Sequence, residues 1–234
     1  MLGLKLAAIY SYPPCKLGFC GAKIKNASKI LADFIQRKKI SLAKVRRVLE
    51  NFEASYFYYQ LIARANGIKD PFDYKVVEAY WLGNKLLDKV KTTDLKKLVL
   101  NKFVGPGLLS KAKPHHSFHV LIIGSITGRV RFTAKVYDLC RIGWGKVIGI
   151  KNSKLKVKSR PLLIKNNKFL LGKEIEKEIT WDRRFLSDLK LGDVVSFHWN
   201  IACQVINKRE NENLLKYTLE SVNSAGNARV KGAN

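Results

Sequence analysis

Apolar residues recur every three or four positions through the first part of the chain, and polar residues with capping side chains interrupt them. Ser, Thr, Asp or Asn before such a run can cap the first turn of a helix, and an Asn-Gly pair after it is typical of a helix end. The pattern predicts four helices: after Asn26, from Ser41 to Asn66, from Asp70 or Asp73 through Leu87, and from Thr93 through Phe103. We therefore expect an all-α region at the N-terminus.

The pattern changes after Gly105-Pro106-Gly107. The apolar stretch after Pro114 favours a helix, and a second helical piece is expected near Phe132 to Leu139. From Cys140 onward polar and apolar residues alternate, which predicts strands over residues 146–150, 154–160, 169–171, 175–181 and 194–199. Five short strands fit a small barrel of the OB type, and a helix is predicted to follow over residues 210–221.

The predicted fold class is therefore α+β, with an N-terminal all-α helical domain followed by a small OB-like β-barrel and a C-terminal helix. We place the helical domain, including its helical connection over residues 115–138, in residues 1–138. The barrel and its helix take residues 139–224. Residues 225–234 are polar and glycine-containing, and are expected to form a flexible tail.

A chain of 234 residues with 47% hydrophobic residues can bury a core, so its high charge does not indicate disorder. The net charge of +26 has two interpretations. It suits a polyanionic partner such as nucleic acid, and it also fits a lysine-rich composition spread along the whole chain. Charge alone does not select a function.

No apolar run reaches the roughly 20 residues that a membrane-spanning helix needs, and the N-terminal apolar stretch is too short for a signal peptide. We therefore expect a cytoplasmic protein without a membrane partner, whose cysteines are reduced thiols. The sequence also lacks the nucleophile-elbow, phosphate-loop and dinucleotide-binding motifs. These observations favour a protein that is not an enzyme.

Two short motifs frame the predicted barrel. The first runs from Cys140 to Gly145-Lys146-Val147, and the second runs from Gly192-Asp193 to His198 and Ala202. Their spacing and order resemble those of the hydrogenase maturation chaperones of the HypC/HupF family. The resemblance covers the barrel and its C-terminal helix, and it implies a non-catalytic accessory protein or chaperone in metallocentre assembly.

In that family the cysteine thiolate takes part in carrying iron, and it docks to a maturation scaffold and to the hydrogenase large subunit. The resemblance implies that Cys140 is a metal ligand or docking residue and that His198 supports it. A soft thiolate and a neutral imidazole suit iron or zinc, so these metals are the candidate cofactors, and the alternative is a protein without a cofactor. Cys140 is internal to the chain, whereas the family's cysteine is N-terminal, and Trp144 stands where the family has a proline.

The four histidines are His198 and three residues of the Pro-His-His-Ser-Phe-His segment. His115 and His119 are four residues apart, so on a helix they share one face and could bind one metal ion. With Cys140 and His198 they would form a Zn²⁺ or Fe²⁺ site, to which Cys20 could add sulfur. Alternatively, the histidines form a helix N-terminus and their imidazoles bond to neighbouring loops. Two segments, Gly18-Phe19-Cys20-Gly21 and Pro114 to His119, are similar to elements of an uncharacterised bacterial family that has an N-terminal helical domain. This similarity extends over the whole chain.

Basic residues alternate with apolar ones along one predicted strand, and they are Lys154, Lys156, Lys158 and Arg160. In a strand they project from one face. OB-type barrels bind single-stranded nucleic acid on such a face, with aromatic rings stacked on the bases. The rings available are Trp144, Trp181, Phe197 and Trp199, which could equally belong to the core. RNA or single-stranded DNA binding is therefore the alternative function, and the same face would also suit an acidic protein partner.

Overall fold

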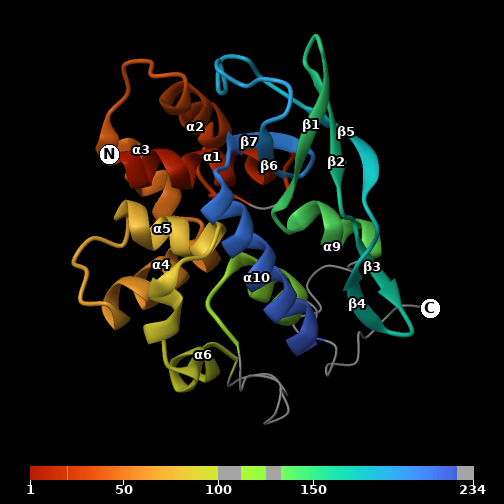
Figure 1. The fold of residues 1–234 in the computed structure, drawn as a ribbon. Coiled ribbons are helices and arrows are strands. Elements are labelled where there is room, and N and C mark those ends of the chain that lie inside the picture. The colour runs from red at the N-terminus through yellow and green to blue at the C-terminus, as the bar shows by residue number, and fades with distance from the viewer. Residues whose placement is uncertain (20, 100–111, 125–132, 226–234) are drawn as a thin grey trace.

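The computed structural model describes residues 1–19, 21–99, 112–124 and 133–225 of the chain. Helices occupy the N-terminal half and the C-terminus, and a small β-barrel lies beside them (Figure 1). The helices are α1 (Leu2–Lys16), α2 (Ala27–Ile35), α3 (Leu42–Glu50), α4 (Glu53–Ala65), α5 (Tyr74–Trp81), η1 (Lys85–Lys89), α6 (Thr92–Val99), α7 (His116–Phe118), η2 (His119–Ile123), α9 (Ala134–Cys140) and α10 (Lys208–Ala225).

The strands are β1 (Gly143–Lys151), β2 (Lys154–Ser159), β3 (Leu162–Lys165), β4 (Lys168–Leu171), β5 (Ile175–Thr180), β6 (Val194–His198) and β7 (Ile201–Val205). Five of them close a barrel in the order β1-β2-β5-β7-β6, and β6 pairs back to β1. β5 and β7 run parallel, and the other neighbours run antiparallel. Counting barrel strands alone, the order is first, second, third, fifth, fourth, as in an OB-type barrel. The predicted α+β class with an OB-like barrel is confirmed.

The membership of the barrel differs from the sequence prediction. The predicted strand at 169–171 forms β4, which pairs with β3 in a separate two-stranded sheet. The fifth barrel strand is β7, which the alternation does not predict. β7 follows β6 through a two-residue turn at Trp199-Asn200, where both residues have positive φ, 52° and 58°. Such a turn usually contains glycine, so its sequence signal is missing here.

The predicted helix from Ser41 to Asn66 is two helices, α3 and α4. The chain breaks at Asn51-Phe52, where the backbone of Phe52 leaves the helical region (ψ 72°) and its ring is buried. The side chain of Asn51 donates to the Arg47 carbonyl at 2.9 Å and so closes the end of α3. The apolar periodicity continues across this break, which is why it predicts one helix.

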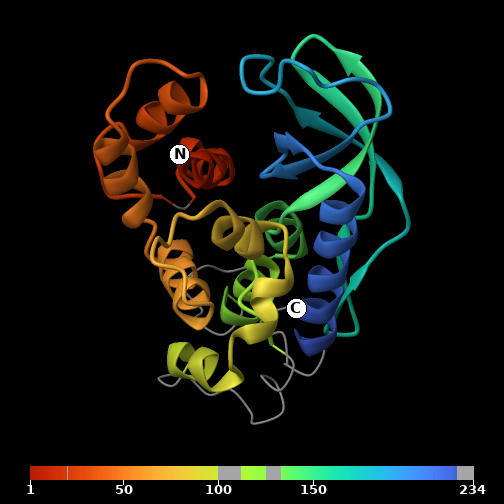
Figure 2. The same ribbon diagram turned by 60° about the vertical axis from the view of Figure 1, so that its left-hand side comes forward.

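Helix α1 lies between the other N-terminal helices and the barrel (Figure 2). Small and aromatic residues such as Ala7, Ala8 and Tyr10 are fully buried on it. It contacts α2, α3 and α5 on one side and β6 and β7 on the other. Both sides of α1 are therefore covered, so it joins the helical half to the barrel.

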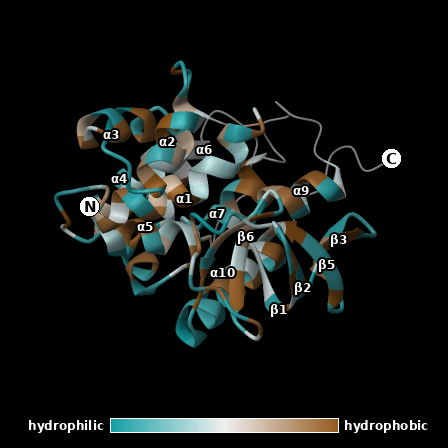
Figure 3. Cartoon of the chain, turned by 90° about the horizontal axis from the view of Figure 1, so that it is seen from above, coloured by the Kyte–Doolittle hydropathy of each residue, from teal (hydrophilic) through white to brown (hydrophobic). Residues whose placement is uncertain are grey.

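One large apolar core includes residues of the N-terminal helices, of α10 and of the β3–β4 hairpin. A smaller cluster, which includes Val157, Ile179 and Phe197, fills the inside of the barrel. Polar and apolar residues alternate along β2, whose apolar side chains are buried, and Figure 3 shows residues of both kinds on this strand. Within the described ranges, no helix combines the length and the apolarity that crossing a bilayer takes. The tail beyond residue 225 lies outside the described residues.

Candidate metal centre

Three elements that are distant in the chain meet beside α1: α7, the end of α9 and the end of β6. They bring together His116, Cys140 and His198, whose candidate ligand atoms all lie within 4.8 Å of one another. The two imidazole rings lie 5.1 Å apart between centroids and are inclined by 79°. Both histidines are buried, and Cys140 is half-buried. Two imidazoles and a thiol at these separations form a group that could hold a metal ion.

The sequence of α1 determines which nitrogen of His198 carries the proton. Pro14 has no backbone N–H, so the carbonyl of Tyr10, four residues earlier, receives no helical hydrogen bond from it. That carbonyl instead accepts from Nδ1 of His198 at 2.8 Å. Because a carbonyl only accepts, the proton is on Nδ1 and Nε2 has a lone pair. In the described part of the chain, this buried Nε2 makes no hydrogen bond of good geometry, although the Cys140 backbone lies close enough to act on the pKa of the imidazole.

His116 is held by two hydrogen bonds in the opposite tautomer. Its Nε2 donates to the Cys140 carbonyl at 2.8 Å, and its Nδ1 accepts from the Tyr80 hydroxyl at 3.0 Å. His115 determines this placement, because it is the N-cap of α7 and its Nδ1 accepts from the N–H of Ser117 at 3.1 Å. The capping residue lies outside the helix, so His116 is the first helical residue and faces Cys140.

Burial keeps the imidazoles of the group neutral. It lowers the pKa of His198 to about 4. Burial also lowers the pKa of His116 well below its usual value, and the neighbouring His198 and His119 lower it further. Neutral imidazole is the form that binds metal ions. Both side chains therefore have the protonation state of a ligand at neutral pH.

Cys140 is the last residue of α9, and the chain becomes extended at Arg141, where ψ is 158°. The end of this helix is tied to the strand that carries His198, because the Leu139 carbonyl accepts from the N–H of Trp199 at 2.9 Å. The Cys140 carbonyl is tied to α7 by the bond from His116 already described. The backbone on each side of the thiol is thus bound to the elements that carry the two histidines.

The glycines of the Cys140 motif allow close packing inside the barrel. A Cβ atom at Gly143 would lie 2.1 Å from the Phe197 ring, and one at Gly145 would lie 2.3 Å from the Lys158 carbonyl. The barrel itself therefore requires these glycines. Among the residues of this motif, Cys140 is the one that joins the histidine group.

Aromatic rings enclose the imidazole side of the group. The Trp81 ring lies 4.5 Å from that of His116 and 5.7 Å from that of His198, between centroids. The Tyr80 ring lies 5.4 Å from that of His116. Trp81 and Tyr80 are both buried. These rings exclude water from the histidines, and the half-buried Cys140 is the more accessible member of the group.

The structure separates the other predicted ligands from this group. His115 has an extended backbone, so the helical face that its spacing to His119 predicts does not form. Its ring stacks on that of Tyr217 instead. The ring of His119 lies 6.4 Å from that of His116, and His119 is outside the three-residue group. Cys20 lies outside the described residues. His116, rather than the predicted His115 or His119, joins Cys140 and His198.

The predicted basic face is present on β2, and acidic residues of β5 neutralise part of its charge. The exposed lysines on this strand are Lys154, Lys156 and Lys158. Lys154 pairs with Glu178 at 3.2 Å and Lys156 with Glu176 at 3.1 Å, both across to β5. The guanidinium of Arg160 donates to backbone carbonyls at the end of β4. This pairing lowers the net positive charge that the face offers to a polyanion.

Most of the rings that base stacking would use are packed in the interior. Trp181, Phe197 and Trp199 are buried. Phe19 covers Trp199 in a stacked arrangement, with 3.9 Å between the ring centroids. These three rings therefore pack in the interior of the described structure. This agrees with the second interpretation of the sequence, in which they belong to the core and do not stack on bases.

The chain matches the model of a protein family described as a family of unknown function (DUF6390), over residues 1–232. Neither the curated proteins nor the solved structures contain a match to it. The family match includes both the helical half and the barrel, and therefore all three residues of the candidate metal centre. Because it spans nearly the whole chain, this protein belongs to the DUF6390 family.

Proposed function

We propose that the protein binds a transition-metal ion through the imidazoles of His116 and His198 and the thiolate of Cys140. The observation that carries this proposal is the buried Nε2 of His198. It has a lone pair, no hydrogen bond of good geometry among the described residues, and two further ligand groups within 4.8 Å. Leaving such a nitrogen unsatisfied costs about 1–3 kcal/mol, and a bound metal ion removes that cost. Two nitrogens and one sulfur suit Zn²⁺ or Fe²⁺.

The surroundings of the two imidazoles support this proposal. Metal-binding histidines usually donate the N–H of their second ring nitrogen to an oxygen, which fixes the ring. The Tyr10 carbonyl serves His198 in this way, and the Tyr80 hydroxyl lies 3.0 Å from Nδ1 of His116. An oxygen partner is thus in place for each ligand.

The proposed role of the bound metal is in metallocentre assembly, without catalysis by this protein. The described group supplies three ligands, and Cys140 is its most accessible member. A three-ligand site keeps a coordination position for an outside ligand. This arrangement suits transfer to a protein partner, either a maturation scaffold or a metalloenzyme client, as the HypC/HupF resemblance implies. His116 comes from the helical half, so the barrel alone would not form the site.

Metal analysis of the purified full chain tests the first part of the proposal. Protein prepared anaerobically without chelators should contain stoichiometric zinc or iron, and His116→Ala, Cys140→Ser and His198→Ala should each lose it. His119→Ala is the matched control, because this neighbouring histidine lies outside the group. Retention of metal by all three variants, or its absence from the wild type, would reject the site.

Co-purification tests the partner. Tagged wild-type protein and Cys140→Ser, expressed at equal levels in the native cell, should differ in the amount of hydrogenase large-subunit precursor that they retain. We expect the precursor with the wild type and its loss with the variant. Equal recovery with both would contradict docking through Cys140, and none with either would contradict a hydrogenase client.

A further inference from the structure

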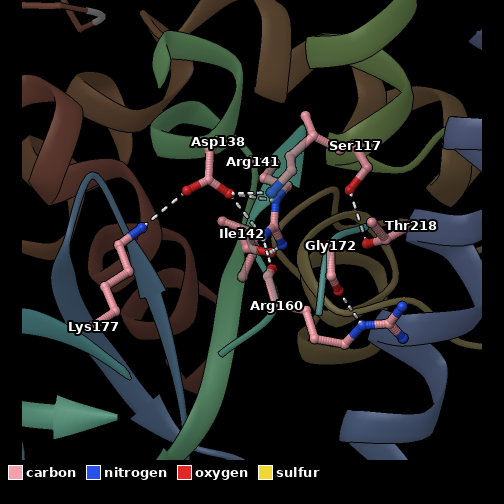
Figure 4. Close-up of polar contacts among 9 residues, drawn as sticks. Ser117, Asp138, Arg141, Ile142, Arg160, Gly172, Lys177 and Thr218 are labelled. Atoms are coloured by element: carbon pink, nitrogen blue, oxygen red, sulfur yellow. Dashed lines mark hydrogen bonds and ion pairs between the residues drawn. The ribbon is translucent and has the colours of Figure 1, made fainter. Parts of the chain in front are cut away.

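Two residues that flank Cys140 in the sequence belong to an ionic network, whose members are drawn in Figure 4. Asp138 precedes the cysteine by two residues, and Arg141 follows it directly. The Asp138 carboxylate accepts from Nη2 of Arg141 at 2.8 Å and from Nζ of Lys177, on β5, at 3.0 Å. The Arg141 side chain is 1% exposed. We refer to Asp138, Arg141 and Lys177 as the ionic network.

The network attaches the end of α9 to separate parts of the barrel region. Nη2 of Arg141 donates to the Arg160 carbonyl, which follows β2, at 2.6 Å. The Asp138 carboxylate also accepts from the N–H of Leu162, on β3, at 2.8 Å. With Lys177 these contacts reach β3, β5 and the residue that follows β2. The segment that carries Cys140 is therefore held at three separate points of the barrel region.

Stability alone is a weak reason for such a network. Burying charged groups costs desolvation free energy, and replacing a buried ion pair by well-packed apolar residues is often neutral or stabilising. Although burial raises the pKa of Asp138, Arg141 and Lys177 hold it below its usual value, so the carboxylate is charged at neutral pH. What the network supplies is a defined geometry for the residues between its members.

The segment that it holds is the one that meets both histidines. The Cys140 carbonyl accepts from His116 at 2.8 Å, and the Leu139 carbonyl accepts from the N–H of Trp199, the residue after His198, at 2.9 Å. In the metal-free protein, a shift at the end of α9 would break both bonds and move the thiol away from the imidazoles. With a metal ion on Nε2 of His116, the bond between Trp199 and Leu139 would still oppose such a shift. The ionic network opposes this shift from the barrel side, together with the packing of the Tyr137 ring against that of Phe169.

We propose that Asp138, Arg141 and Lys177 are positioning residues that hold the Cys140 thiolate toward the two imidazoles, so that the bound metal has a sulfur ligand. This proposal rests on the proposed metal site, and it adds three residues that act on the metal only through Cys140. Outer residues that orient metal ligands typically change metal affinity by about 10–100-fold when they are replaced.

Anaerobic titration with Co²⁺ of the full chain tests this role, because a thiolate ligand gives Co²⁺ a near-ultraviolet charge-transfer band. We expect Asp138→Asn and Arg141→Met to lose this band, as Cys140→Ser does, and to bind Co²⁺ about 10–100-fold more weakly than the wild type. Lys177→Met leaves the Asp138–Arg141 ion pair intact and should give a weaker band than the wild type. This variant tests the proposal even if Arg141→Met does not fold. Ile179→Val, in the barrel core on the same strand as Lys177, is the control.

The control should melt at a lower temperature and keep both the band and the affinity of the wild type. If Asp138→Asn behaves like this control, the network is merely structural and our proposal is overturned, while metal binding stands. A wild type that binds Co²⁺ without the band would also overturn it, since Cys140 would then not be a ligand. A wild type that binds no Co²⁺ would reject the metal site itself, and the positioning role with it.

Discussion

At the scale of single residues, the hydrogen bonds of His116 determine how a metal ion can enter. Its Nε2 carries a proton, because it donates to the Cys140 carbonyl. A metal ion on that nitrogen must displace the proton, and Nδ1 must then carry one. The Tyr80 hydroxyl can accept as well as donate, so this pair can reverse its direction without moving either side chain.

We therefore predict that zinc changes the tautomer of His116 and not that of His198. In ¹⁵N-labelled protein, long-range ¹H–¹⁵N spectra should show the His116 proton on Nε2 without zinc and on Nδ1 with it. His198 should show its proton on Nδ1 in both states, because the Tyr10 carbonyl holds it there. Persistence of the Nε2 proton on His116 at saturating zinc would exclude Nε2 of His116 as a ligand.

Tyr80→Phe should weaken metal binding by about 10–100-fold, because it removes the oxygen beside Nδ1 of His116. Tyr59→Phe is the matched control. The Tyr59 hydroxyl accepts from Nε1 of Trp81 at 2.6 Å and bonds to neither ligand imidazole. Competition titrations with a chromophoric zinc chelator give both dissociation constants. Equal constants for the two variants would contradict a supporting role for Tyr80.

At the scale of elements, Pro14, one of two prolines in α1, connects this helix to the site. Pro14→Ala should restore a backbone N–H toward the Tyr10 carbonyl, which would then compete with Nδ1 of His198. We expect metal affinity to fall by about tenfold, while the helix itself gains stability. Pro13→Ala is the control, because the carbonyl that it affects, that of Ile9, contacts the Cys203 thiol. An equal effect of both variants on affinity would show that the Tyr10 carbonyl has no special role.

The outcome for the histidine segment shows what a local pattern can predict. The apolar spacing identifies a helix after Pro114, and the structure has one. Which imidazole faces Cys140 depends on two details that the spacing does not encode. His115 is an N-cap with an extended backbone, and the turn from His119 to Ile123 is π-helical, so the assumed α-helical register fails on both sides. Cys140 and His198 could be paired from their motifs, whereas the third member of the candidate site, His116, depends on tertiary contacts.

At the scale of the whole molecule, the candidate site joins the two halves of the chain. His116 belongs to the helical half, whereas His198 belongs to the barrel, and the large apolar core includes residues from both. Local periodicity predicts many of the helices and strands, but it misses α1, β3 and β7 and merges α3 with α4. It does not predict that α10 returns to pack on α7 and η2, because that contact joins residues about a hundred positions apart in sequence. The site is therefore a property of the assembled protein.

Burial of the histidines predicts how stability depends on pH. The pKa is lowered to about 3 for His115, to about 4 for His119 and His198, and well below 6.5 for His116, in each case mainly by burial. In the unfolded chain each histidine titrates near 6.5. Above that pH neither state binds the proton, so the histidines add no pH dependence. Below it only the unfolded state takes up protons, and the free energy of unfolding falls.

The free energy of unfolding should fall by roughly 1.4 kcal/mol per pH unit for each histidine as the pH is lowered below 6.5. The fall should level off as the histidines of the folded protein titrate near pH 4. Urea denaturation of metal-depleted protein between pH 7.5 and pH 5 measures it, with four histidines giving roughly 5–6 kcal/mol per pH unit at the acid end. His119→Gln, which removes one buried imidazole outside the metal group, should reduce this slope by about a quarter. Stability that stays constant or rises on acidification over this range would mean that the histidines are not buried as neutral groups.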